Sequence, residues 1–102
     1  MTKNEKREHG DVLYEAILTL KDLEECKKFF SDLCTVAELR AMEQRFEVAM
    51  LLSDGMIYND ILERTGASSA TISRVNRSLQ YGADGYQAVL PRIQEKLGGD
   101  GI

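Results

Sequence analysis

The sequence predicts an all-α fold of about six helices, and three observations support this prediction. The 102-residue chain contains one proline, Pro91, so most helical segments can run without interruption. Apolar side chains recur at spacings of three and four residues along most of the chain, which is the period of an amphipathic helix. With 43% hydrophobic and 29% charged residues, the composition is that of one small globular domain. No stretch reaches the roughly 20 apolar residues of a membrane span, so we expect no membrane partner.

The first part of the chain is expected to form a flexible arm followed by two helices. Residues 1–10 are polar, show no periodicity and contain no apolar export signal, which favours a cytoplasmic protein. One helix is expected from Asp11, its candidate N-cap, and another from about Asp22. Their apolar faces are formed by Val12, Leu13, Ala16, Ile17 and Leu20 in the first helix and by Leu23, Cys26, Phe30 and Leu33 in the second.

A third helix is expected from Thr35 to about Ser53. It starts with a capping box, in which the Thr35 hydroxyl accepts the Glu38 amide and the Glu38 carboxylate reaches back to the Thr35 amide. Gly55 follows its end and suits a left-handed C-terminal cap. The helix is apolar over most of its circumference. In so short a chain, this predicts that a second subunit covers part of it, although the chain's own helices could suffice.

Residues 57–80 have the apolar skeleton of a helix-turn-helix unit. Gly66 lies at the turn, where glycine adopts a positive φ angle at low cost. Ser68 or Ser69 can cap the second helix. On the inner face of that helix, aliphatic side chains return at Ile72, Val75 and Leu79.

The opposite face of the second helix carries the candidate DNA-binding residues. Small, hydroxyl-bearing and positively charged side chains share it, at Ala70, Ser73, Arg74 and Arg77. Because no carboxylate lies between Ser68 and Gln80, this helix can enter a major groove without repelling phosphate. Arginine can bind guanine or phosphate, Ala70 can touch a thymine methyl, and Ser68 and Ser69 are candidate phosphate ligands. The alternative for the two arginines is an ordinary solvated helix face.

The distribution of charge is consistent with a local binding site for double-stranded DNA. The net charge of −4 argues against a nonspecific polyanion binder. Residues 11–55 hold five basic and ten acidic side chains, whereas residues 56–81 hold three arginines against two carboxylates. The helix-turn-helix segment is therefore the part of the chain that can attract phosphate.

The C-terminal part is expected to contain a short helix around Gln87 to Leu97, after a glycine-containing loop over residues 81–86. Pro91 would lie near the beginning of this helix, where proline is tolerated. Residues 98–102 are expected to form a flexible tail. The predicted domain thus spans residues 11–97.

The chain lacks the residues that catalysis or a cofactor would need. The single histidine, His9, falls in the predicted arm, and no nucleophile, metal-ligand or phosphate-loop motif is present. Cys26 and Cys34 lie at positions that suit small apolar side chains, so we expect two reduced thiols rather than a metal site. We therefore expect neither an enzyme nor a bound cofactor.

Three segments make the chain resemble the tryptophan repressor family, and in particular its TrpR-related YerC/YecD branch. They are LCTVAELR at residues 33–40, the helix that contains Arg45, and GASSATISR at residues 66–74 followed by Ser78 and Leu79. The resemblance covers residues 11–95. It implies about six helices, an intertwined homodimer and sequence-specific operator binding.

The resemblance also implies an effector pocket. Arg45 and Arg74 match the two arginines between which the family holds the tryptophan indole, and Thr35 and Ser78 match positions near the ends of that ligand. Where the tryptophan repressor has a glycine after the second arginine, this chain has Val75, which argues against tryptophan. Another small effector remains open, as does an empty pocket in which Arg45 pairs with a neighbouring carboxylate such as Glu38 or with a residue of the partner subunit.

The sequence thus predicts a cytoplasmic transcriptional regulator that binds DNA as a homodimer, and we expect it to act as a repressor. The alternative is a helix-turn-helix module that contacts other proteins in a transcription complex and has no operator of its own. In that case the acidic residues 11–55 would form its docking surface.

Overall fold

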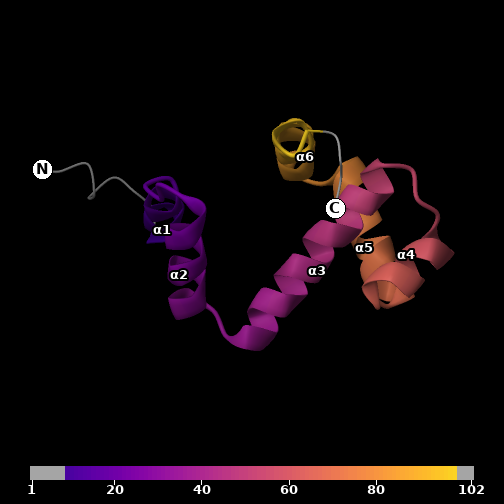
Figure 1. Cartoon of the computed structure of the whole chain (residues 1–102), viewed down its shortest axis with the longest axis horizontal. Coiled ribbons are helices and arrows are strands. Elements are labelled where there is room, and N and C mark those ends of the chain that lie inside the picture. The colour runs from indigo at the N-terminus through magenta and orange to yellow at the C-terminus, as the bar shows by residue number, and fades with distance from the viewer. Residues whose placement is uncertain (1–8, 99–102) are drawn as a thin grey trace, which may run out of the picture. The chain divides into compact units, whose positions relative to one another are not determined.

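The computed structural model describes residues 9–98, which form six helices and no strands (Figure 1). The all-α prediction is therefore confirmed. The helices are α1 (His9–Ile17), α2 (Leu23–Leu33), α3 (Val36–Ser53), α4 (Tyr58–Thr65), α5 (Ser69–Tyr81) and α6 (Gly85–Lys96). The chain divides into two compact units, and the predicted domain over residues 11–97 stays a prediction. The N-terminal unit ends at Leu39 and the C-terminal unit begins at Arg40, within α3.

The first helix begins at His9, two residues before the predicted start at Asp11. Asp11 therefore lies in the first turn of α1, where its charge complements the helix dipole, and is not the N-cap. Residues 1–8 of the predicted arm lie outside the described residues, and residues 9 and 10 belong to α1. Residues 99–102 of the predicted tail also lie outside them.

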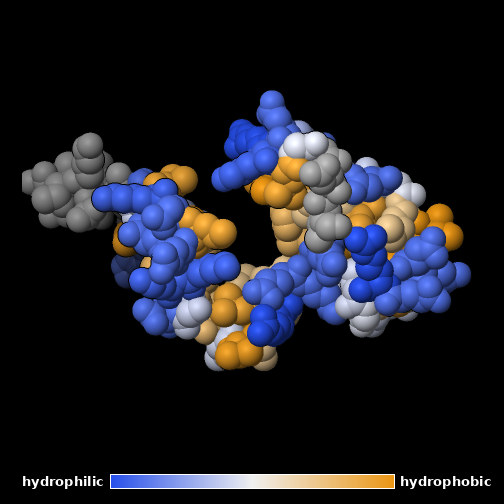
Figure 2. Space-filling model, in the orientation of Figure 1, coloured by the Kyte–Doolittle hydropathy of each residue, from blue (hydrophilic) through white to orange (hydrophobic). Residues whose placement is uncertain are grey.

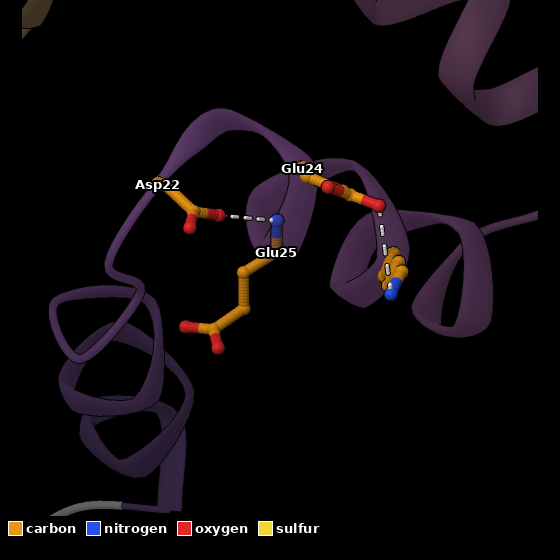
Figure 3. Close-up of polar contacts among 4 residues, drawn as sticks. Asp22, Glu24 and Glu25 are labelled. Atoms are coloured by element: carbon orange, nitrogen blue, oxygen red, sulfur yellow. Dashed lines mark hydrogen bonds and ion pairs between the residues drawn. The ribbon is translucent and has the colours of Figure 1, made fainter.

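Local hydrogen bonds and an ion pair define α2 (Figure 3). The carboxylate of its N-cap, Asp22, accepts the amide of Glu25 at 2.8 Å, and the Glu25 carboxylate accepts the Lys21 amide at 3.0 Å. One turn further on, Lys28 Nζ lies 3.8 Å from the Glu24 carboxylate, with both side chains largely exposed. An exposed pair of this kind stabilises a helix by only a few tenths of a kcal/mol, roughly 0.2–0.5.

The apolar faces of α1 and α2 are largely exposed. Neither helix contains a buried residue. Large apolar side chains in and beside them are exposed, and hydrophobic patches are visible on the face drawn in Figure 2. Leu18 is 80% exposed and Leu23 is 70% exposed. Amphipathic helices are stable in proteins mainly through burial of their apolar faces, and α1 and α2 contain no buried residue of this kind.

The capping box predicted at the start of α3 is present. Thr35 Oγ1 accepts the Glu38 amide at 3.1 Å, and the Glu38 carboxylate accepts the Thr35 amide at 2.8 Å. At the other end, Gly55 has a φ of 91°, and its amide donates to the Leu52 carbonyl at 3.0 Å. Both predicted boundaries of this helix are confirmed.

The C-terminal half of α3 is the centre of the core. Four consecutive residues, Val48 to Leu51, are at most 4% exposed, so the helix is covered on all sides there. The cover comes from the same chain, through Ile61 of α4, Ile72 of α5 and Leu90 of α6. For this half of α3, the alternative in which the chain's own helices suffice applies, and the predicted second subunit stays a prediction.

The last helix begins at Gly85, earlier than the predicted Gln87, and Pro91 lies in its middle rather than near its beginning. Asp84, with a φ of 69°, precedes it as the N-cap. Two glutamine side chains hold α6 in place. Gln87 donates to the Leu79 carbonyl at 2.7 Å, and Gln94 donates to the Asp54 carboxylate at 3.1 Å. These bonds and the buried Leu90 anchor the helix on both sides of the proline.

Within the described part of the chain, no helix is both long and apolar enough to traverse a bilayer. The same residues contain no group of three or more His, Cys, Asp or Glu side chains arranged to hold a metal ion. Cys26 and Cys34 are free thiols, each partly exposed.

Candidate nucleic-acid interface

A left-handed glycine creates the sharp turn between α4 and α5. Gly66 has φ 73° and ψ 6°, and its amide donates to the Leu62 carbonyl at 2.9 Å. No described atom outside its chain neighbours would contact a Cβ there within 4 Å, so the conformation and not the space favours glycine. A residue with a Cβ in the left-handed region costs about 1–2 kcal/mol.

Thr65 organises the same turn through its side chain and its carbonyl. Its hydroxyl donates to the Ile61 carbonyl at 2.7 Å and accepts the amide of Ala67 at 3.0 Å. Its carbonyl accepts a hydrogen bond from Gln44 Nε2 of α3 at 3.2 Å. Ala67 is 3% exposed, so the turn is packed against the core as well as hydrogen-bonded.

The inner face of α5 is buried as the sequence predicts. Ile72 is fully buried, Val75 is 2% exposed, and Leu79 packs against the core as a partly buried residue. Ile61 of α4 is also fully buried. The orientation of α5 is therefore fixed by its own aliphatic residues, which leaves the opposite face in solvent.

Most of the predicted DNA-binding residues lie on the opposite face of α5 and are exposed to solvent. The exposed residues are Ser69, Ala70, Ser73, Arg74 and Arg77. Neither arginine forms an ion pair or a hydrogen bond with another described residue, so both guanidinium groups are available. Residues at helical spacings of three and four, such as 70, 73, 74 and 77, lie on one side of a helix.

Ser68 is the N-cap of α5. Its hydroxyl accepts the Thr71 amide at 3.1 Å and lies 3.1 Å from the Thr71 hydroxyl, to which it donates. The sequence left Ser68 and Ser69 open as caps, and the structure assigns this task to Ser68. With the Ser68 hydroxyl occupied, Ser69 and the amides of the first turn are the groups left to contact a phosphate.

A pocket with a volume of about 490 Å³ lies beside this face, between α3, α5 and α6. It is lined by Ala41, Gln44, Arg45, Thr71, Arg74, Val75, Ser78 and Tyr86. Three of the four predicted effector residues, Arg45, Arg74 and Ser78, are therefore brought together. The lining contains two arginines and no carboxylate, which favours a negatively charged occupant.

Thr35, the fourth predicted residue, belongs to the N-terminal unit, where its hydroxyl serves the capping box. The predicted alternative for Arg45, a pairing with Glu38, is not formed. Arg45 makes no ion pair with a described residue, and the Glu38 carboxylate accepts the Thr35 amide. The Arg45 side chain is thus exposed at the wall of the pocket, and its positive charge is not neutralised by an ion pair with a described residue.

Val75 and Tyr86 shape the inner wall of the pocket. Val75 belongs both to the buried core and to the lining, as expected from its place on the inner face. Tyr86 is not among the residues that the sequence predicts for the pocket, because residues 81–86 are expected to form a loop. In the structure Tyr86 is the second residue of α6 and its ring lies 6.3 Å from that of Phe46. No local signal in the sequence identifies Tyr86, because its place depends on Phe46, which is distant in the chain.

Comparison with known proteins agrees with this architecture. The family profile described as Trp repressor protein matches residues 8–94. An uncharacterized protein, YerC of Bacillus subtilis (strain 168), is 54% identical over 85 residues, which cover 83% of this chain and 82% of YerC.

Two solved structures are similar in fold and sequence. One is a crystal structure from Staphylococcus aureus, described as a candidate Trp repressor, with a TM-score of 0.81 and 48% identity over 91% of this chain and 94% of that one. The other is a TrpR-like protein from Eubacterium eligens ATCC 27750, with a TM-score of 0.78 and 52% identity over 94% of this chain and 96% of that one. The chain therefore belongs to the Trp repressor family.

Proposed function

We propose that this protein is a sequence-specific DNA-binding transcriptional repressor of the cytoplasm that reads its operator with α5. One observation carries the proposal. The exposed face of α5 presents two unpaired arginines and small or hydroxyl-bearing residues, and the buried face of the same helix fixes its direction. Membership of a family of regulators adds to it.

The exposed face has the chemistry that a major groove requires. Arg74 and Arg77 can each bind guanine through two hydrogen bonds or neutralise a phosphate, and Ser73 can do either more weakly. Ala70 is small enough for a thymine methyl to approach. Because no carboxylate lies on α5, contact with the phosphate backbone is not opposed there.

We propose further that the active species is a homodimer. The exposed apolar residues of α1 and α2 motivate this step, because a second copy of the chain would supply the surface that these helices lack. Two copies related by a two-fold axis would present two α5 helices to half-sites about 34–36 Å apart, or a multiple of this distance. The operator would then be close to palindromic.

The pocket between Arg45 and Arg74 is the proposed place for any small effector. Arg74 lines the pocket and also belongs to the exposed face of α5, so an occupant could change how this side chain meets DNA. Val75 and Tyr86 occupy space on the inner wall, and on this ground we propose that tryptophan is not the effector. Calorimetric titration with tryptophan should give no binding heat, and saturable heat would refute this proposal.

Selection of duplexes from a random DNA pool tests the main proposal. The protein should enrich a motif with dyad symmetry, and Arg74→Ala and Arg77→Ala should each weaken binding of the enriched duplex in a gel shift, by about 1–3 kcal/mol where a bidentate base contact is lost. Affinity should fall steeply between about 50 and 200 mM salt. Enrichment of nothing, with no salt response, would favour the alternative, a protein-interaction module that uses its acidic residues for docking.

A further inference from the structure

Gln44 links the core helix to the helix-turn-helix. It lies on α3, is partly buried, and its Nε2 donates to the Thr65 carbonyl at 3.2 Å across a separation of 21 residues. Thr65 is the last residue of α4, so its carbonyl is one of the acceptors that a helix end leaves without an intrahelical donor. A side chain of another helix thus satisfies a backbone group of the turn.

The turn is fixed through Thr65 in a chain of hydrogen bonds. The carbonyl of Thr65 is held by Gln44, and its hydroxyl holds the amide of Ala67, one residue before the N-cap of α5. Gly66, between them, is conformationally permissive and does not stiffen the turn by itself. The rigidity of the entry into α5 therefore depends on these side-chain bonds and on the packing of Ala67.

A small change at this turn would be amplified along α5. The helix has 13 residues and is therefore about 20 Å long, so a tilt of roughly 5° about its start moves its far end by about 1.7 Å. Such a shift is larger than the range of donor–acceptor distances that a hydrogen bond tolerates. Arg77, in the second half of α5, would lose its register with a base edge before α5 lost its core contacts.

We propose that Gln44 is a positioning residue for DNA recognition, which sets the direction of α5 by holding the Thr65 carbonyl and touches no DNA itself. This inference rests on the function proposed above. It assigns to Gln44 a task separate from its place in the lining of the effector pocket. A task of this kind affects discrimination between sequences more than it affects general attraction to DNA, because phosphate contacts tolerate displacement better than bidentate base contacts.

Gln44→Met tests the inference, since methionine has a similar length and no donor. The probes are the duplex that the wild-type protein enriches from a random pool and a scrambled duplex of the same composition. We expect the ratio of the two affinities to fall about fivefold or more, as for loss of one hydrogen bond to a partly buried group. Gln44→Lys, which restores a donor, should recover the ratio, although its charge raises affinity for both duplexes. If Gln44→Met does not fold, Gln44→Asn, whose amide is one methylene short of Thr65, takes its place.

Gln94→Met is the control. It removes a hydrogen bond from a glutamine amide of α6 to the Asp54 carboxylate, which lies just after α3, and it touches neither the turn nor α5. It should alter thermal stability without changing the affinity ratio. An unchanged ratio in Gln44→Met, or an equal loss in Gln94→Met, would overturn the inference.

Amide hydrogen exchange separates this inference from the proposed function, because it needs no DNA. In the free protein, Gln44→Met should accelerate exchange of the Ala67 amide about fivefold relative to the Ile72 amide, and Gln94→Met should not. If selection enriches no duplex, the proposed function fails, and the positioning of α5 for recognition fails with it. The exchange result can still establish in that case that Gln44 holds the turn. If selection succeeds and Ala67 exchange is unchanged, only the inference about Gln44 fails.

Discussion

The two units of this chain are both helical and amphipathic, yet only one of them has a core of its own. In the C-terminal unit, residues from α3, α4, α5 and α6 bury one another, and Val48, Ile61 and Ile72 are fully buried. In the N-terminal unit, α2 has a well-formed N-cap and an ion pair, yet neither α1 nor α2 has a buried residue. Local signals therefore suffice to define a helix, while its stability has to come from packing. The C-terminal unit thus has its own core, whereas the proposed homodimer is what would cover the apolar residues of the N-terminal unit.

The largest difference between the units should appear in truncations of apolar side chains. Ile72→Ala should destabilise the protein by about 2–5 kcal/mol, because it leaves a cavity in a fully buried site. Leu18→Ala, at a side chain that is 80% exposed, should change stability by less than about 0.5 kcal/mol at concentrations where the chain is monomeric. Urea denaturation followed by circular dichroism measures both values. Equal losses in the two variants would mean that the N-terminal unit has a core within one chain.

A charge on the exposed apolar face of α2 should prevent assembly. Leu23→Glu places a carboxylate on a face that the proposed dimer would bury, at a cost of about 2 kcal/mol or more. The first turn of a helix favours acidic residues, so the helix itself should be unaffected. Light scattering should report a monomer for Leu23→Glu and a dimer for the control Lys27→Glu, which changes an exposed polar position of the same helix. A dimer of undiminished stability in Leu23→Glu would exclude this face from the interface.

Glycine-to-alanine changes should have opposite signs in the two units. Gly66→Ala should destabilise the protein by about 1–2 kcal/mol, because alanine resists the left-handed conformation that the turn requires. Gly10→Ala lies within α1, without a positive φ and without a neighbour within 4 Å, and should be neutral or stabilise its helix by up to about 1 kcal/mol. Thermal unfolding of both variants measures the contrast. A harmless Gly66→Ala would show that the turn accepts another backbone conformation.

Local chemistry made much of this structure predictable from the sequence. The capping box of Thr35 and Glu38, the left-handed Gly66 and the buried Ile72 and Val75 were all predicted, because each depends on residues close together in the chain. Membership of the Trp repressor family, whose members are regulators and not enzymes, confirms the resemblance and the expectation that the chain is not an enzyme.

The features that the sequence does not predict depend on contacts between residues that are far apart in the chain. Pro91 was placed near a helix start because the sequence does not reveal that Gln87 and Gln94 anchor α6 on both sides of it. Tyr86 and Gln44 were not singled out, since nothing local indicates that one lines a pocket or that the other bonds to a turn 21 residues away. The element that covers each part of α3 cannot be predicted either, because periodicity identifies an apolar face but not the element that packs on it.

The smallest expected effect compares the N-caps of the two units. Ser68→Ala removes the acceptor of the Thr71 amide, and Asp22→Ala removes the acceptor of the Glu25 amide, each at a cost of about 1 kcal/mol to its own helix. Because α5 contributes to the core, Ser68→Ala should lower the urea midpoint of the C-terminal unit. Asp22→Ala should accelerate amide exchange at Glu25 and leave that midpoint unchanged, since α2 contributes no buried residue. A lowered urea midpoint in Asp22→Ala would mean that fraying of α2 destabilises the core. The two units would then unfold as one cooperative structure.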